Sequence, residues 1–195
     1  MDRRMFLGGL AAFAAAPVKA AAIMQDGINP ALRDRALAAF ARHRRRIVHS
    51  DVIGIVDYAR PSREPRFHLL DMATGRTETL LVAHGKGSDP AHSGWLERFS
   101  NDHGSHASSE GAFLTANEYI GQHGRSMRLH GLEPSNDAAL ARAIVVHSAS
   151  YVTPALARER GKLGRSFGCF TVTAGDLPKV LARLGEGRLL YSDKV

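Results

Sequence analysis

The sequence has little cysteine and lacks several patterns that define common protein classes. Its 195 residues contain a single cysteine, Cys169, so no disulfide can form within the chain. It shows no internal repeat, no low-complexity tract and no glycine-rich phosphate-binding fingerprint, which argues against a repeat architecture and against the common nucleotide-binding loops. Beyond the N-terminus no apolar run reaches the roughly 20 residues that a membrane-spanning helix needs. We therefore expect a soluble mature protein.

The composition is that of one globular domain. Hydrophobic residues make up 44% of the chain, which is enough for a sizeable core, and the formal net charge is +7. A moderate basic excess suits nucleic acid, an anionic membrane or an acidic cell-wall polymer, and does not choose among them. The densest basic run, 42–46, follows a predicted helix, where cations suit the C-terminal dipole. We interpret it as a solvated helix end and expect no nucleic-acid partner.

The first 22 residues have the layout of a cleavable export signal. MDRRMFLGGLAAFAAAPVKAAA begins with charges, continues with an apolar run that is short for a membrane span, and ends in small residues. Its Arg3-Arg4-Met5-Phe6-Leu7 resembles a twin-arginine signal, R-R-x-F-L. An amphipathic first helix is the alternative, but the run has no polar face. We expect export to the periplasm, and an unpaired cysteine in that oxidising compartment indicates either a link between chains or a reactive thiol.

Apolar periodicity predicts a mostly β fold with peripheral α-helices. The predicted divisions are the export signal at 1–22, an N-terminal helix within 23–48 that starts at Asn29-Pro30, and a catalytic domain at 49–195. Short apolar runs predict strands, the first three forming an antiparallel meander, at 52–58, 66–72, 78–84, 112–115, 126–130, 143–148 and 188–191. Two short helices are predicted after Thr153-Pro154 and over 177–184. The long irregular stretch 85–110 is of a length that is usually functional or mobile.

Three readings of Cys169 are open from the residues alone: a buried filler, a link between chains and a nucleophile. Gly164, Ser166 and Gly168 surround it with small residues, so the thiol could lie open in a tight turn. Attack by sulfur requires the thiolate, and the usual proton acceptor is histidine. Among ten histidines, His147 stands out because it ends an apolar strand, where the backbone would fix it as a base must be fixed. A capping role for His147, without chemistry, stays open.

Several blocks resemble the L,D-transpeptidases with a YkuD-type catalytic domain, bacterial cell-wall enzymes with a histidine, a spacer and then S-x-G-C. Here His147 is followed by a spacer and by Ser166-Phe167-Gly168-Cys169. The similarity is greatest to the murein L,D-transpeptidase branch and runs from about residue 53 to 172. It includes FSNDHGSHASSEGAFLT (99–115), YIGQHGRSMRLHGLEPSND (119–137), RAIVVHSASYV (142–152) and GKLGRSFGCF (161–170). Such blocks in order are far more specific than S-x-G-C alone. The resemblance implies a catalytic β-sandwich.

The resemblance also implies a set of catalytic roles. Cys169 would be the nucleophile and His147 its base, oriented by Ser148 or by a main-chain carbonyl. Backbone N–H groups near Gly168 and Cys169 would stabilise the oxyanion. The substrate would be a peptidoglycan stem tetrapeptide, which forms a thioester on Cys169 and releases D-alanine. An amine would then take the acyl group, giving a 3–3 cross-link or attachment of an acceptor protein, which the sequence does not identify. No metal or organic cofactor is needed.

Substrate contacts are predicted at Ser166, Arg165, Arg128 and His130. Arg165 is assigned to a substrate carboxylate, with a plain surface role as the alternative. Two departures from the family pattern keep other functions open. Many members have a second histidine in S-H-G-C, where this chain has Phe167, and many have an arginine soon after the cysteine, where this chain has 170–172, FTV. The alternatives are an L,D-carboxypeptidase that uses water, a non-catalytic peptidoglycan-binding module, and a structural cysteine that links two chains.

Histidines outside the motif are interpreted as structural. His103 and His106 are three residues apart, a spacing that can bind metal, but no further ligand cluster accompanies them, so we read them as loop residues. His84, at the end of a predicted strand, is likewise assigned a structural role, and Trp95 is expected to pack the long loop onto the domain.

Overall fold

A computed structural model describes residues 27–195, so the predicted export signal at 1–22 lies outside the described residues. In chain order the elements are α1 (Pro30–Arg42), β1 (Val52–Asp57), β2 (Phe67–Asp71), β3 (Thr77–Leu80), β4 (Val82–Ala83), the 3₁₀ helix η1 (Lys86–Ser88), β5 (Gly111–Gly121), β6 (Gly124–Gly131), β7 (Val145–Ser148), α2 (Pro154–Arg160), β8 (Phe170–Val172), α3 (Leu177–Leu184) and β9 (Leu189–Asp193). Within 27–195 no helix is both long and apolar enough to cross a bilayer.

The strands form one sheet that folds over on itself into a sandwich. Their order is β3-β2-β1-β9-β5-β6-β7-β8-β4, with parallel pairs β1/β9 and β7/β8 and antiparallel pairs elsewhere. The main core lies between the two halves, because it joins Val56 and Phe67 of β1 and β2 to Met127, Val146 and Phe170 of β6, β7 and β8. The prediction of a mostly β sandwich with peripheral helices is therefore confirmed.

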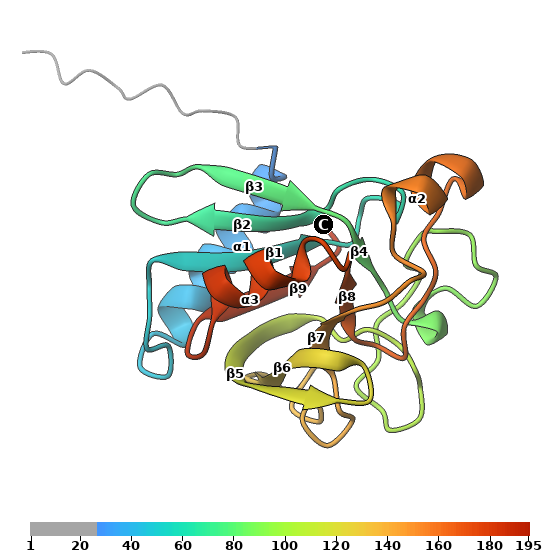
Figure 1. Cartoon of the computed structure of the whole chain (residues 1–195). Helices are drawn as coiled ribbons and strands as arrows, with labels where there is room; N and C mark the ends of the chain where they lie inside the picture. Colours follow the sequence, from blue (N-terminus) through green and yellow to red (C-terminus); the bar gives the residue numbers. More distant parts are fainter. Residues whose placement is uncertain (1–26) are drawn as a thin grey trace, which may run out of the picture.

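Helices cover both faces of the β1/β2 half. Alternate residues of a strand point to opposite faces, and in β1 Val56 joins the core that contains α3 whereas Ile55 joins the cluster that contains α1. Figure 1 shows α1 and α3 on opposite sides of these strands. The helix α1 begins at Asn29, whose side chain accepts a hydrogen bond from the Ala31 N–H, followed by proline at the first helical position. It shares one apolar cluster with β1, β5 and β9.

The strand predictions need three corrections. The predicted strand 78–84 is two strands, because the chain leaves β2 after Leu80 and pairs with β8 through Val82. The strand predicted at 112–115 continues to Gly121 through a bulge after Thr115 and forms a long hairpin with β6. The strand predicted at 143–148 starts only at Val145, because Ala143 has φ +54°, in the left-handed region.

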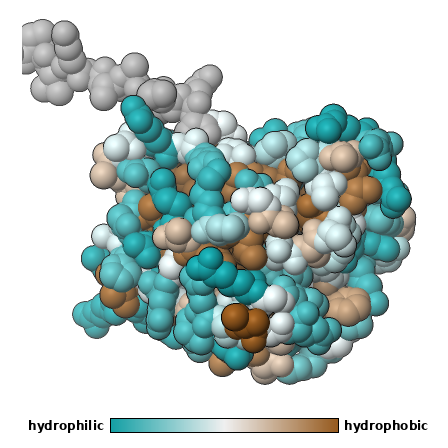
Figure 2. Space-filling view, in the orientation of Figure 1, coloured by the Kyte–Doolittle hydropathy of each residue, from teal (hydrophilic) through white to brown (hydrophobic). Residues whose placement is uncertain are grey.

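The surface is mostly hydrophilic with scattered apolar residues. Figure 2 shows polar side chains over most of the face seen in Figure 1, with hydrophobic residues between them rather than in one broad band. The large exposed apolar side chains of the described residues are Val48, Trp95, Ile120, Leu140 and Phe167. Phe167 is the one that lies within the Ser-x-Gly-Cys segment, two residues before the cysteine.

Candidate active site

A tight turn holds the cysteine at the start of β8. The Ser166 hydroxyl donates to the Cys169 carbonyl at 2.8 Å and accepts from the Gly168 N–H at 3.1 Å, so it closes the turn from within. Gly168 has φ +113°, and a Cβ there would lie 2.6 Å from the Ala107 carbonyl oxygen. Glycine is required at this position for both reasons. Ser166 is buried and shapes the turn, and the Gly168 N–H predicted as an oxyanion donor already donates to Ser166.

A second strand pins this turn from the other side. The Ser166 N–H donates to the His84 carbonyl at 2.9 Å, and its carbonyl accepts from the Lys86 N–H at 2.8 Å. The segment after β4 therefore lies alongside the nucleophile turn, with a bridge between Gly85 and Ser166. This contact fixes one end of the long irregular stretch 85–110, in which the structure has only η1 as a helix.

His147 faces the same side of the sheet as the cysteine. In β7 and β8, Val146 and Phe170 point into the core, so their neighbours His147, Cys169 and Thr171 belong to the opposite face. His147 is directly opposite Thr171 in the parallel pair. Cys169 is therefore one diagonal step from His147, a separation of about 7 Å between β-carbons. Its hydrogen bond is to the Ala143 carbonyl, at 3.6 Å from the sulfur.

The tautomer of His147 is that of a base. Its Nδ1 lies 3.0 Å from the Ser148 carbonyl oxygen, which can only accept, so Nδ1 carries the proton and Nε2 has the lone pair. Both predicted orienting groups thus coincide in the main chain of Ser148. The Nε2 atom lies 3.1 Å from the Thr171 hydroxyl, which also contacts the Tyr151 hydroxyl at 3.3 Å. Burial lowers the pKa of His147, which favours the unprotonated form at neutral pH.

One histidine at this site was missed by the sequence analysis. His123, at the tip of the β5/β6 hairpin, stacks on the His147 ring with centroids 4.4 Å apart and planes 20° apart. The positive charge of His123 further lowers the pKa of His147. The GQHGR segment of a hairpin turn carries no signal for this contact, because it depends on how far the hairpin curls across the sheet.

The state of the thiol differs from the expectation of an open cysteine with a depressed pKa. Cys169 is only 8% exposed, and burial raises its pKa. The Val145 N–H and the charge of Arg142 act in the opposite direction. The sulfur is therefore shielded from water but lies beside polar groups, and its ionisation depends on local charge.

The predicted substrate residues occupy different places. Arg128 and His130 are half-buried on β6, and Arg128 pairs with Val145, so both lie on the face that carries His147. The Arg128 guanidinium stacks on the Tyr119 ring at 4.2 Å. Arg165 instead donates to the main-chain carbonyls of Asp89 and Pro90, which ties the nucleophile turn to the long loop.

A hollow of about 310 Å³ adjoins the nucleophile turn. The residues that line it are His103, Gly104, His106, Ala141, Arg142 and Phe167. Phe167, 61% exposed, stands between the His106 ring, at 4.5 Å, and the Lys86 ammonium, at 4.4 Å from its ring centroid. Across residues 27–195 no group of three or more His, Cys, Asp or Glu side chains is placed to hold a metal ion.

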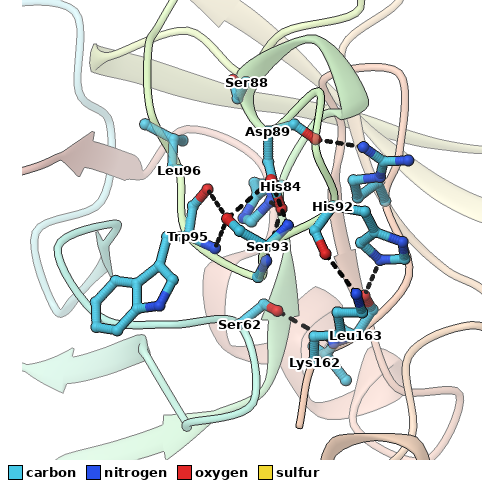
Figure 3. A network of polar contacts seen from close by, with 12 residues as sticks. Ser62, His84, Ser88, Asp89, His92, Ser93, Trp95, Leu96, Lys162 and Leu163 are labelled. Carbon is cyan, nitrogen blue, oxygen red and sulfur yellow. Dashed lines mark hydrogen bonds and ion pairs between the residues drawn. The ribbon is translucent and has the colours of Figure 1, made fainter. Parts of the chain in front are cut away.

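A buried polar network supports the loop beside the site. Arg66 and His84 are both buried, and Arg66 Nη2 lies 2.8 Å from His84 Nδ1, while His84 Nε2 lies 3.1 Å from the Asp89 carboxylate. Figure 3 shows His84 and Asp89 with Ser93, whose N–H and hydroxyl both donate to Asp89. These contacts agree with a structural role for His84.

The same network reaches the segment that precedes the nucleophile turn. His92 contacts the Leu163 carbonyl at 2.8 Å, and the Leu163 N–H donates to Ser62 at 3.1 Å, contacts that Figure 3 also shows. Lys162 donates to the His92 carbonyl at 2.5 Å. The loop and the chain leading to Cys169 are therefore held as one polar framework.

Comparison with known proteins identifies the family. Residues 24–192 match the family described as L,D-transpeptidase catalytic domain, and the chain belongs to it. The match includes α1, which packs on the same sheet. No curated protein matched the sequence.

Similar solved structures carry the same description at low sequence identity. An L,D-transpeptidase from Mycobacterium smegmatis is 13% identical, with a TM-score of 0.43 over 73% of this chain and 58% of that one. L,D-transpeptidase 3 from Mycobacterium tuberculosis, in complex with a faropenem-derived adduct, is 13% identical with a TM-score of 0.47 over 74% and 60%. The helical cell shape determining protein Pgp2 from Campylobacter jejuni is 8% identical with a TM-score of 0.48 over 86% and 57%. The chain thus spans less than two thirds of each of these proteins.

Proposed function

We propose that this protein is a cysteine L,D-transpeptidase that acts on peptidoglycan stem tetrapeptides. The observation that carries the proposal is the pairing of the Ser-x-Gly-Cys turn with a base-form histidine on the same sheet face. Membership of the L,D-transpeptidase family supports this chemistry. The donor, the acceptor and the thioester are the finer parts of the proposal.

The proposed reaction has two proton transfers through His147. Its Nε2 takes the thiol proton, and the sulfur of Cys169 bonds to the carbonyl carbon of the L-centre of the diamino acid. The bond to D-alanine breaks, and its amine leaves with the proton from His147. An acceptor amine then attacks the thioester, and its proton passes through His147 to the sulfur as the C–S bond breaks. For the first step Nε2 must exchange the Thr171 hydroxyl for the thiol.

The site is proposed to work in the periplasm. The signal-like segment 1–22, with Arg3-Arg4, supports export by the twin-arginine route. The acceptor is an amine of a second stem or of a protein. Water as the acceptor would make the enzyme an L,D-carboxypeptidase.

A second candidate is a non-catalytic module that binds peptidoglycan. The observations that favour it are the low exposure of Cys169, the raised pKa of its thiol and the occupied Nε2 of His147. A link between chains is disfavoured by the same burial, because an 8% exposed sulfur is poorly placed to meet a second chain.

The test is the intact mass of the mature protein after incubation with a purified disaccharide-tetrapeptide, beside Cys169→Ala. The transpeptidase predicts a thioester adduct on the wild type alone, release of D-alanine and a 3–3 dimer. Trimming to a tripeptide without a dimer would assign the carboxypeptidase. A folded wild type that gives no adduct and no D-alanine would overturn the enzyme and favour the binding module.

A further inference from the structure

Arg142 carries a charge that no neighbouring carboxylate neutralises. Its Nη1 donates to the Ser100 carbonyl and the Ser109 hydroxyl, both at 2.7 Å, and its Nη2 donates to the Ala107 carbonyl at 2.6 Å and the Ser105 hydroxyl at 3.2 Å. All four acceptors are neutral. Within residues 27–195 Arg142 forms no ion pair, although other arginines do. An arginine that serves only to fasten a loop needs no such absence of counter-charge.

This guanidinium lies against the nucleophile turn. A Cβ on Gly168 would be 3.2 Å from Arg142 Nη2, so the charge sits directly behind the residue that precedes Cys169. The next residue, Ala143, accepts the thiol hydrogen bond. Ala143 has φ +54°, a left-handed conformation that costs an alanine about 1 kcal/mol, and strained residues of this kind concentrate at functional sites. The turn 142–143 thus presents both a carbonyl and a positive charge to the sulfur.

We propose that Arg142 is a positioning residue that supplies the positive potential for ionisation of Cys169. The thiol form is stabilised by the Ala143 carbonyl, which accepts its proton. The thiolate form loses that bond and gains the attraction of the guanidinium, which acts through a shielded region where charge interactions are strong. In the same direction, burial raises the pKa of Cys169 and the charge of Arg142 lowers it.

Few other ionisable groups face the sulfur. Tyr58, after β1, and Tyr151, after β7, interact with it, and burial raises the pKa of each, to about 12 for Tyr58. His147 lies a diagonal step away with a lowered pKa. Between pH 8 and 10 all three are therefore expected to be neutral, which leaves Arg142 as the charge that favours the thiolate.

The experiment uses the single cysteine as its own reporter. The rate of alkylation of Cys169 by iodoacetamide is measured against pH, by intact mass, in the full mature chain. Arg142→Gln removes the charge, and Arg142→Lys keeps the charge but loses the forked contacts to the loop. Arg98→Gln is the matched control, because Arg98 lies in the same loop and donates to the Gly87 carbonyl.

The expected result is a thiol pKa about one unit higher in Arg142→Gln, which is about a tenfold lower alkylation rate below that pKa. Arg142→Lys and Arg98→Gln should stay within about twofold of the wild type. Equal shifts in the Gln and Lys variants would show that Arg142 acts only by holding the loop, and an unshifted, folded Gln variant would also overturn the proposal. If Arg142→Gln does not fold, Arg142→Met provides the same test with a stem of similar volume. None of these readouts requires peptidoglycan, so they are independent of the proposed function.

Discussion

Lowering the pH should destabilise the fold through one buried histidine, His84. Arg66 can only donate hydrogen bonds, so the Nδ1 atom of His84 that it contacts must carry a lone pair. The proton of His84 is therefore on Nε2, which donates to Asp89. A second proton would have to displace the Arg66 contact. Burial, together with the charge of Arg66, lowers the pKa of His84 to about 4.

The sign and size of the effect follow from proton binding in the two states. In the unfolded chain His84 takes up a proton below its ordinary pKa of about 6.5, whereas in the folded protein it does so only near 4. Between these values the unfolded state holds more protons, so stability falls as the pH falls. At about 1.4 kcal/mol per pKa unit the loss is on the order of 3 kcal/mol by pH 4. That is a large share of the roughly 5–15 kcal/mol typical of a domain.

Urea unfolding at pH 7.5 and pH 4.5, followed by circular dichroism, measures this loss. His84→Gln can retain an acceptor for Arg66 and a donor for Asp89 but cannot titrate. The free energy of unfolding of the variant should therefore fall by about 2–3 kcal/mol less than that of the wild type between the two pH values. His49→Gln, a change at an exposed histidine, is the control and should keep the wild-type dependence. Equal losses in the wild type and His84→Gln would refute the reasoning.

Three further predictions concern the site. His147→Gln should slow acylation of Cys169 by about 10²–10⁴-fold, measured by rapid-quench mass spectrometry, because the general base is lost; an unchanged rate would remove His147 from the mechanism. His123→Ala should raise the pKa of His147 in an NMR titration, because both the stacked ring and its charge are lost, and His123→Phe, which keeps a ring, should raise it less; a fall in either variant would contradict this. Gly168→Ala should lower the stability by about 2 kcal/mol or more in thermal melts, from backbone strain and the contact with the Ala107 carbonyl; Gly104→Ala, with open space around its Cβ, should cost less, and equal costs would argue against a role for the contact.

Local sequence signals predicted the individual elements well where the pattern was local. The helix α3 has the predicted limits 177–184, and α1 and α2 start at their Asn-Pro and Thr-Pro pairs. Each of these boundaries is set by capping groups within a few residues. The first three strands form the predicted antiparallel meander for a similar reason, because short turns join strands that are adjacent in sequence.

Long-range pairing could not be predicted in the same way. The three-residue β8 was hidden in the motif, because it is too short to show periodicity and it pairs with β7, to which it is parallel, and with β4, about 90 residues earlier in the sequence. Contacts that depend on this pairing were also missed, among them Thr171 with His147 and His123 on the same ring. Arg165 was assigned to substrate on charge alone, whereas its place beside the Asp89 and Pro90 carbonyls depends on the Gly85–Ser166 bridge.

The same parallel pairing explains how the site can work without the two family residues that this chain lacks. The turns that precede parallel strands meet at one end of the sheet, so residues 142–143 before β7 lie beside residues 168–169 before β8. A cation that follows the cysteine in many family members is replaced in space by Arg142, which precedes the histidine strand. Phe167, in the second-histidine position, points to Lys86 and His106 instead of the sulfur. The base role then falls to His147 and the charge role to Arg142, and each can be removed separately by substitution.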